Sequence, residues 1–121
     1  MTRREIRPAA GQPVDINTVS LSPNVAVYRL WFKPVGGKYG PPIKTGDTDD
    51  NEPDTLRIET MPPSSSVGYF VAISGRKAIA PYRVLLTFSQ GGAALSGGHC
   101  LHEGNTDANG YAEVWGEVVS V

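Results

Sequence analysis

The sequence lacks the residues for covalent cross-links within the chain: only one of its 121 residues is a cysteine, Cys100, so no intramolecular disulfide can form. The fold must rest on hydrophobic burial, which favours a reducing compartment or a virion over a disulfide-stapled domain. No apolar run reaches about 18 residues, which excludes a membrane-spanning helix. The start, Met1–Pro8, is charged and no apolar run follows it. The sequence therefore predicts no signal peptide and favours a cytoplasmic or virion-associated protein over a secreted one.

Net charge is also nearly absent, since 11 basic residues face 12 acidic ones for a formal charge of -1. This balance gives no electrostatic reason to expect a nucleic acid as partner. The one local basic group, Arg3, Arg4 and Arg7, is typical of a short solvated arm. Neither glycine pair, 36–37 or 91–92, is followed by the lysine and helix of a phosphate-binding loop.

Turn-forming residues are abundant, with 14 glycines and 10 prolines, and apolar residues recur with period two rather than 3.6. Both features predict an all-β protein: a single domain, residues 1–121, folded as an antiparallel β-sandwich of the immunoglobulin-like type with about seven strands. The predicted strands are residues 3–7, 14–21, 25–33, 55–60, 67–74, 82–89 and 111–121. The predicted core is Tyr28, Leu30, Phe32, Leu56, Ile58, Tyr69, Val71, Val84, Leu86, Phe88, Val114 and Val118.

Two long connections separate the predicted strands. The first, a loop at residues 34–54, is long for a compact domain, and such loops are usually either functional or simply solvated. Lys38 and Tyr39 are its candidate ligand-binding residues. The second connection runs from Gly91 to Asn105 and is rich in glycine.

The pair Asn109-Gly110 lies between two alternating segments and is a strong hairpin signal, because both residue types tolerate a positive φ. The sequence thus predicts that the chain ends in paired antiparallel strands, with Gly110 at positive φ.

The C-terminal third, residues 82–121, resembles the closing half of invasin/intimin-type bacterial immunoglobulin-like domains. The resemblance is carried by Phe88-Ser89, by the Ala93–Ser96 link and by the Thr106–Gly110 turn. It implies a sandwich fold and a spacer, adhesive or virion-associated role.

Two groups of residues have the chemistry of metal ligands. His99, Cys100 and His102 fall within four residues and offer a thiolate and two imidazoles, which suit zinc or copper. Asp47 and Asp49 begin an acidic loop with oxygen donors for calcium, although the EF-hand spacing fails further along. The alternative interpretation is that both are ordinary polar loops. No cofactor is expected, and calcium and zinc are the alternatives.

The two tryptophans are predicted to point outward, on strands 25–33 and 111–121, with charged residues on either side of each. If both strands flank 82–89, a leucine lies between the indoles, and exposed aromatics of this kind often mark interfaces. The predicted interaction face is Arg29, Trp31, Lys33, Leu85, Glu113, Trp115 and Glu117. The alternative is that the long loop or cross-strand charge pairs cover these rings.

Three functions follow from these features. The favoured one is a non-enzymatic structural or interaction module, such as a phage assembly component, which forms a homo-oligomer or docks on a protein partner. The second is a carbohydrate-binding module in which Trp31, Trp115 and Tyr39 stack on a glycan. The third is a small metal-binding protein or cysteine-dependent enzyme centred on Cys100.

Overall fold

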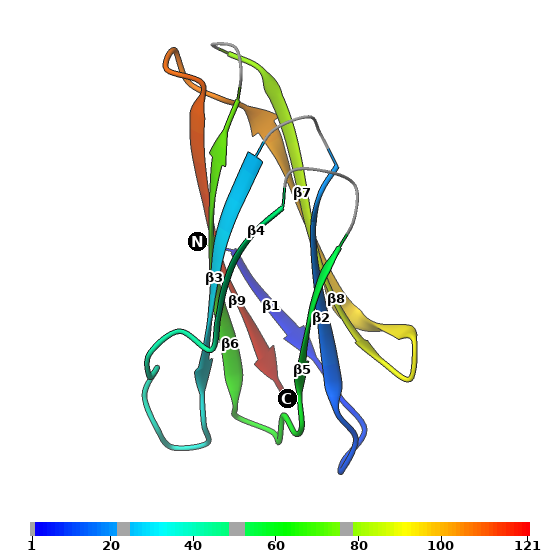
Figure 1. Cartoon of the computed structure of the whole chain (residues 1–121). Coiled ribbons are helices and arrows are strands. Elements are labelled where there is room, and N and C mark those ends of the chain that lie inside the picture. The colour runs from blue at the N-terminus through cyan, green and yellow to red at the C-terminus, as the bar shows by residue number, and fades with distance from the viewer. Residues whose placement is uncertain (1, 22–24, 49–52, 76–78) are drawn as a thin grey trace.

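A computed structural model describes residues 2–21, 25–48, 53–75 and 79–121, and these contain nine strands and no helix. The strands form a five-stranded sheet, in the order β1-β9-β6-β3-β4, and a four-stranded sheet, in the order β5-β2-β7-β8. The two sheets face each other as the layers of a sandwich (Figure 1). Their bounds are β1 Thr2–Ile6, β2 Val14–Ser20, β3 Val25–Lys33, β4 Lys44–Thr48, β5 Asp54–Ile58, β6 Ser66–Ser74, β7 Pro81–Gln90, β8 Ala93–Asn105 and β9 Tyr111–Ser120.

The predicted two-sheet sandwich is confirmed, and all seven predicted segments are strands. Alternation of side chains places one set of each strand between the layers, as in β7, where Val84, Leu86 and Phe88 are fully buried. Nine of the twelve predicted core residues are buried, and Phe32, Leu56 and Ile58 are partly buried against them. Ile6, Val14, Ile16, Ala26, Met61, Val67, Ile73 and Cys100 complete the core cluster.

Two strands were not predicted. β4 lies within the supposed loop 34–54 and pairs with β3, and β8 occupies nearly all of the glycine-rich connection from Gly91 to Asn105. Both are edge strands of low apolar content, which form because a neighbour supplies the hydrogen-bonding partner. The glycines of β8 are required by crowding: a side chain on Gly98 would come within 2.8 Å of the Phe88 carbonyl oxygen, beside an irregularity in the β7–β8 pairing.

The predicted terminal hairpin is wrong, although Gly110 does adopt a positive φ of 74°. The Thr106–Gly110 turn connects β8 in one sheet to β9 in the other, and β9 pairs with β6 and, in parallel, with β1. One Asp107 carboxylate oxygen accepts hydrogen bonds from the backbone N–H groups of Asn109 and Tyr111, which stabilises the turn. The same local turn chemistry therefore serves a crossing between sheets.

Tyrosines that face glycines across the strands recur through the fold. Three tyrosine rings occupy the space that the side chain of the directly paired glycine would fill: Tyr28 beside Gly46, Tyr69 beside Gly116 and Tyr82 beside Gly104. Two of these rings carry their hydroxyl groups to the opposite sheet. Tyr28 donates a hydrogen bond to Asp54 on β5, at 2.7 Å, and the Tyr69 hydroxyl lies 2.5 Å from His102 Nε2 on β8. The two layers are thus joined on both sides of the core.

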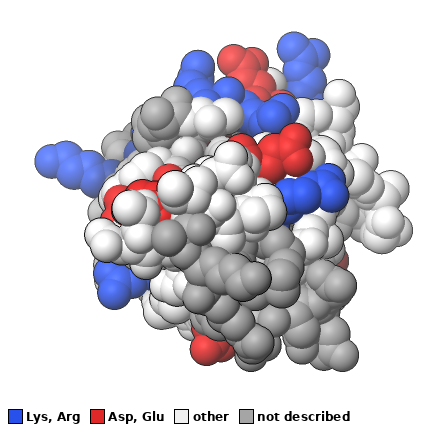
Figure 2. All heavy atoms as spheres, turned by 90° about the horizontal axis from the view of Figure 1, so that it is seen from above, with Lys and Arg blue, Asp and Glu red and all other residues white. Residues whose placement is uncertain are grey.

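The surface at one end of the sandwich carries charges of both signs. Figure 2 looks down on the end with the Thr106–Gly110 turn, and its basic and acidic side chains are interspersed rather than gathered into one field. None of the described segments is a helix that is long and apolar enough to cross a membrane.

Candidate binding groove on the five-stranded sheet

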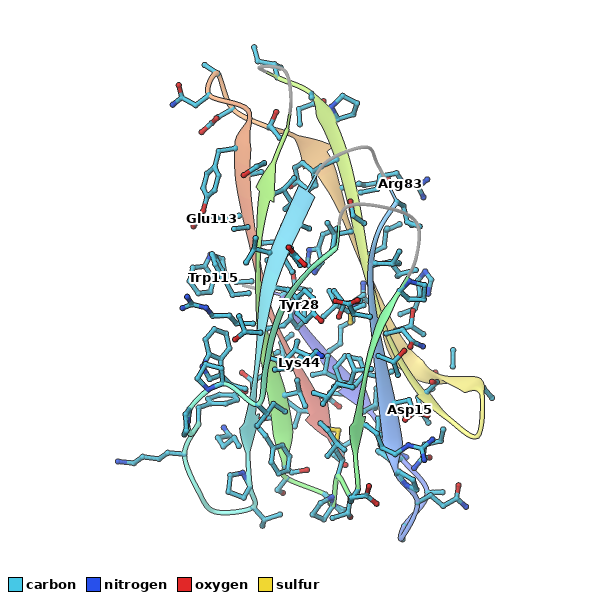
Figure 3. The ribbon with its side chains drawn as sticks, viewed as in Figure 1. Asp15, Tyr28, Lys44, Arg83, Glu113 and Trp115 are labelled. Carbon is cyan, nitrogen blue, oxygen red and sulfur yellow. The ribbon has the colours of Figure 1, made fainter. Side chains whose placement is uncertain are left out.

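Both tryptophans lie on the outer face of the five-stranded sheet, as predicted, on the two strands that flank β6. Strand register puts Trp31, Gly68 and Glu117 in one row across β3, β6 and β9. The next row holds Arg29, Phe70 and Trp115. Trp115 is 51% exposed and projects away from the sandwich (Figure 3), whereas Trp31 is half-buried.

Leu85 does not lie between the indoles, so this part of the predicted face is wrong. β7 belongs to the four-stranded sheet, where Leu85 is paired with Val19 and Leu101. The residue between the tryptophan-bearing strands is Phe70 of β6, whose ring packs against Trp115 with centroids 4.3 Å apart and ring planes tilted by 45°. The apolar stripe exists, but β6 rather than β7 forms its centre.

Tyr39 reaches this face from the segment between β3 and β4. Its hydroxyl is 3.0 Å from Ser66 Oγ, and its ring lies above Gly68, where a side chain would come within 3.2 Å of the ring. Lys33 Nζ lies 5.4 Å from the centre of the same ring, within the range of a cation–π interaction. Three separate contacts therefore hold Tyr39 in place. The neighbouring Lys38 is exposed and does not line the groove described next.

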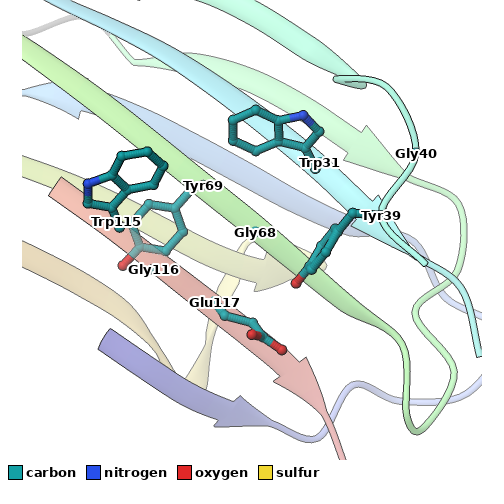
Figure 4. Close-up of a pocket in the computed structure, with 8 residues that line it drawn as sticks. All are labelled: Trp31, Tyr39, Gly40, Gly68, Tyr69, Trp115, Gly116 and Glu117. Atoms are coloured by element: carbon teal, nitrogen blue, oxygen red, sulfur yellow. The ribbon is translucent and has the colours of Figure 1, made fainter. Parts of the chain in front are cut away.

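The aromatic rings surround a groove of about 340 Å³ (Figure 4). Trp31, Tyr39 and Trp115 rise around it, and its floor includes Gly68, which carries no side chain on this outer face of β6. Its lining is predominantly apolar. This volume is at the lower end of the roughly 300–1,000 Å³ that is usual for ligand pockets. The complete lining is Trp31, Tyr39, Gly40, Gly68, Tyr69, Trp115, Gly116 and Glu117.

Charged residues flank the groove asymmetrically. Arg29 and Lys33 extend along β3 on one side, and Glu113 and Glu117 along β9 on the other. Glu117 is the one charged residue in the lining, and no ion pair joins its carboxylate to another described residue. Burial raises the pKa of Tyr39, and the nearby Glu117 carboxylate raises it further, against the lowering effect of the Ser66 hydrogen bond. Glu113 accepts a hydrogen bond from the Tyr111 hydroxyl at 2.7 Å.

The candidate metal ligands are not brought together. His99 is exposed, whereas the next residue of β8, Cys100, is fully buried, because neighbouring side chains of a strand point to opposite faces. Asp47 is exposed on β4, and Asp49 lies outside the described residues. Within residues 2–21, 25–48, 53–75 and 79–121, no three histidine, cysteine, aspartate or glutamate side chains are grouped as metal ligands.

Cys100 and His102 instead belong to a polar cluster between the sheets, with Tyr69 and Arg4. Burial raises the pKa of the Cys100 thiol, against the lowering effects of the Arg4 charge and a hydrogen bond to Tyr69, so the thiol is a poor nucleophile. Burial also raises the pKa of the Tyr69 hydroxyl. Arg4 Nε is buried and has no hydrogen-bond partner in the described part of the chain. This cluster adjoins the groove, because Tyr69 is also one of the residues that line it.

Acid should weaken the fold through this cluster. Burial, and secondarily the charge of Arg4, lowers the pKa of His102 below its ordinary value of 6.5. The native state therefore resists protonation of His102. The part of the folding stability that depends on neutral His102 is fully present above about pH 6.5 and is lost as the pH falls towards the lowered folded-state pKa.

Melting temperatures at about pH 7.5 and 5.5 check this expectation. Substitution His102→Gln should reduce the loss of stability in acid, while His99→Gln, which changes the other histidine of the chain, should leave it unchanged. An undiminished acid dependence in His102→Gln would show that other groups cause it.

Gly40, Gly68, Tyr69 and Gly116 are the groove residues that sequence reasoning missed. The alternation of 67–74 already places Gly68 outward, so the signal existed for one of them. What the sequence lacked was the order of the strands.

Comparison with known proteins adds nothing further, because no family model, no curated protein and no solved structure matches the chain.

Proposed function

We propose that the protein is a non-enzymatic binding module that docks another molecule by taking one of its groups into the aromatic groove. The observation that carries the proposal is the convergence of Trp31, Tyr39 and Trp115, from β3, the β3–β4 segment and β9, on one open groove. Aromatic rings of this kind supply large contact areas, and they are enriched where proteins bind partners.

Preorganisation supports a binding role over incidental exposure. Tyr39 is held by Ser66, Gly68 and Lys33, and Trp115 packs against Phe70, so two of the rings are positioned before any ligand arrives. Binding to such a surface loses less conformational entropy than binding to mobile side chains. Gly68 carries no side chain on the outer face of β6, which leaves room for the Tyr39 ring beside the groove.

A second copy of the chain is the other candidate partner, and the separation of charge favours it. If two copies docked face to face about an axis parallel to β6, the basic β3 of each would meet the acidic β9 of the other. Arg29 of one copy would then face Trp115, between Glu113 and Glu117 of the other. The homo-oligomer expected from the sequence would then be a dimer with twofold symmetry.

The finer classes expected from the sequence stay proposals. An immunoglobulin-like sandwich is consistent with the parallel pairing of β1 with β9. The invasin/intimin resemblance, and with it a spacer or virion-associated role, rests on the sequence of the C-terminal third.

The groove is tested by its own fluorescence, because both tryptophans of the chain line it. Titration with a panel of neutral, cationic and zwitterionic small molecules and oligosaccharides should shift the emission for at least one class. Trp115→Ala should weaken that binding at least about tenfold, since exposed aromatics at the centre of a site contribute most of its affinity. The thermal transition should change little, because Trp115 is half exposed.

Tyr111→Ala is the matched control, since Tyr111 is another exposed aromatic residue of β9 and does not line the groove. It should bind as the wild type does. Light scattering at micromolar concentration tests the second candidate, which predicts a dimer that Trp115→Ala dissociates. A monomer whose tryptophan emission responds to no member of the panel would contradict both forms of the proposal.

A further inference from the structure

We propose that the groove binds a phosphocholine group, with the trimethylammonium end between the aromatic rings beside Glu117 and the phosphate end at Lys33. The inference rests on the proposed function, because it names the ligand of the same site. It is carried by the arrangement of rings and charges around the groove (Figure 4).

The ring arrangement suits a methylated cation. Three aromatic rings around a space that only one charged residue, Glu117, enters form the kind of cage that recognises quaternary ammonium groups. The ring faces attract positive charge electrostatically, and the carboxylate adds a negative charge that no described residue neutralises by an ion pair. One of the three rings already lies beside a cation, since Lys33 Nζ is 5.4 Å from the Tyr39 ring centre.

The few polar groups of the groove disfavour a sugar as its main ligand. A bound sugar must find hydrogen-bond partners for several hydroxyls, or lose the water bonds that they made. The Tyr39 hydroxyl is already bonded to Ser66, and Glu117 is the only charged side chain in the predominantly apolar lining. A trimethylammonium group has no N–H to donate and presents only methyl groups, so it leaves no hydrogen-bond donor unsatisfied in such a lining, and the rings and Glu117 offset the loss of its hydration.

The basic side chains of β3 are the reason for proposing a phosphate at the other end of the ligand. Lys33 Nζ lies 5.4 Å from the centre of the Tyr39 ring, and Arg29 lies four residues before it on the same outward face of β3. The acidic side chains are on β9, on the far side of β6. A ligand with one positive and one negative end therefore has a single favourable orientation across the groove, and an ammonium alone leaves Lys33 without a counter-charge.

The test compares four dissolved probes through tryptophan emission. These are phosphocholine, choline, the neutral carbon analogue of choline with a tert-butyl group in place of the trimethylammonium group, and cellobiose. Phosphocholine should bind most tightly, and choline at least about tenfold more tightly than its neutral analogue, because the two differ in charge and hardly in shape. Phosphatidylcholine vesicles then show whether a lipid headgroup also reaches the groove.

Three variants separate the two ends of the ligand. Glu117→Gln should weaken phosphocholine and choline at least about fivefold without changing the binding of the neutral analogue. Lys33→Gln should weaken phosphocholine while leaving choline as tight or tighter, because it removes the phosphate partner and a competing cation. Lys38→Gln, an exposed lysine of the same connecting segment that does not line the groove, should change neither.

The inference is overturned if the neutral analogue or cellobiose shifts the emission as strongly as choline does, or if Glu117→Gln leaves choline binding intact. In either case the groove still binds ligands and the proposed function stands. If no probe of any class shifts the emission, the proposed function falls as well. Circular dichroism of each variant confirms that a loss of binding reflects a lost contact rather than unfolding.

Discussion

Replacing Gly97 by alanine is expected to destabilise the protein by about 2–5 kcal/mol, although the residue lies on an exposed edge strand. Gly97 has φ 81°, a conformation that costs any residue with a Cβ roughly 1–2 kcal/mol. The added methyl group would also overlap the carbonyl oxygen of Glu5 on β1. A backbone atom cannot swing aside as a flexible side chain can, so β1 would have to separate from β8.

Gly92 supplies the matched control, because it has nearly the same φ, 82°, and no atom within 4 Å of the position of an added Cβ. Gly92→Ala should therefore cost only the backbone strain of about 1–2 kcal/mol. Denaturant unfolding of the two variants measures the difference. Equal losses of stability would show that β1 does not lie against β8 at Gly97, and the N-terminal strand would then be placed wrongly.

Leu86→Ala should cost about 2–5 kcal/mol, because Leu86 is fully buried between the sheets and its truncation leaves a cavity. The neighbouring Leu85→Ala should cost about 1 kcal/mol or less, since Leu85 lies on the outer face of the four-stranded sheet and keeps part of its surface in water. The two substitutions remove the same atoms from consecutive positions of β7. Their difference therefore reports the register of the strand alone.

Urea unfolding of both variants gives this difference directly when the free energy of unfolding falls with urea concentration at the same slope in each. A larger loss for Leu85→Ala would mean that β7 is turned over, with Leu85 inside. Because the same alternation places the outward residues of β3, β6 and β9, that result would also weaken the argument for the groove.

Much of the local structure could be predicted from the sequence, because alternation along a strand is a property of neighbouring residues. It identified seven strands, and it placed Leu86 inside and Trp31 and Trp115 outside. Of the residues named for the face and its loop, four line the groove: Trp31, Tyr39, Trp115 and Glu117. Leu85 was the error, and it came from assigning β7 to the wrong sheet.

The unpredicted strands, β4 and β8, are the part of the secondary structure that local sequence patterns do not predict. Their sequences are rich in glycine and polar residues and have weak preference for an extended conformation. They are strands because β3 and β7 offer them backbone hydrogen bonds, and β8 needs Gly97 and Gly98 where other backbone segments approach closely. A glycine that signals a loop in the sequence here permits close packing.

By itself, the sequence determined which side of each strong strand faces the core, the positive φ at Gly110, and the two tryptophans on outward positions. The tertiary structure alone decided that β6 separates those tryptophans, that the Thr106–Gly110 turn crosses between sheets, and that Tyr39 folds over Gly68. The reason is physical: burial and turn chemistry act between residues close in sequence. The order of strands depends instead on how distant segments compete for the same hydrogen-bonding edges and for the same core.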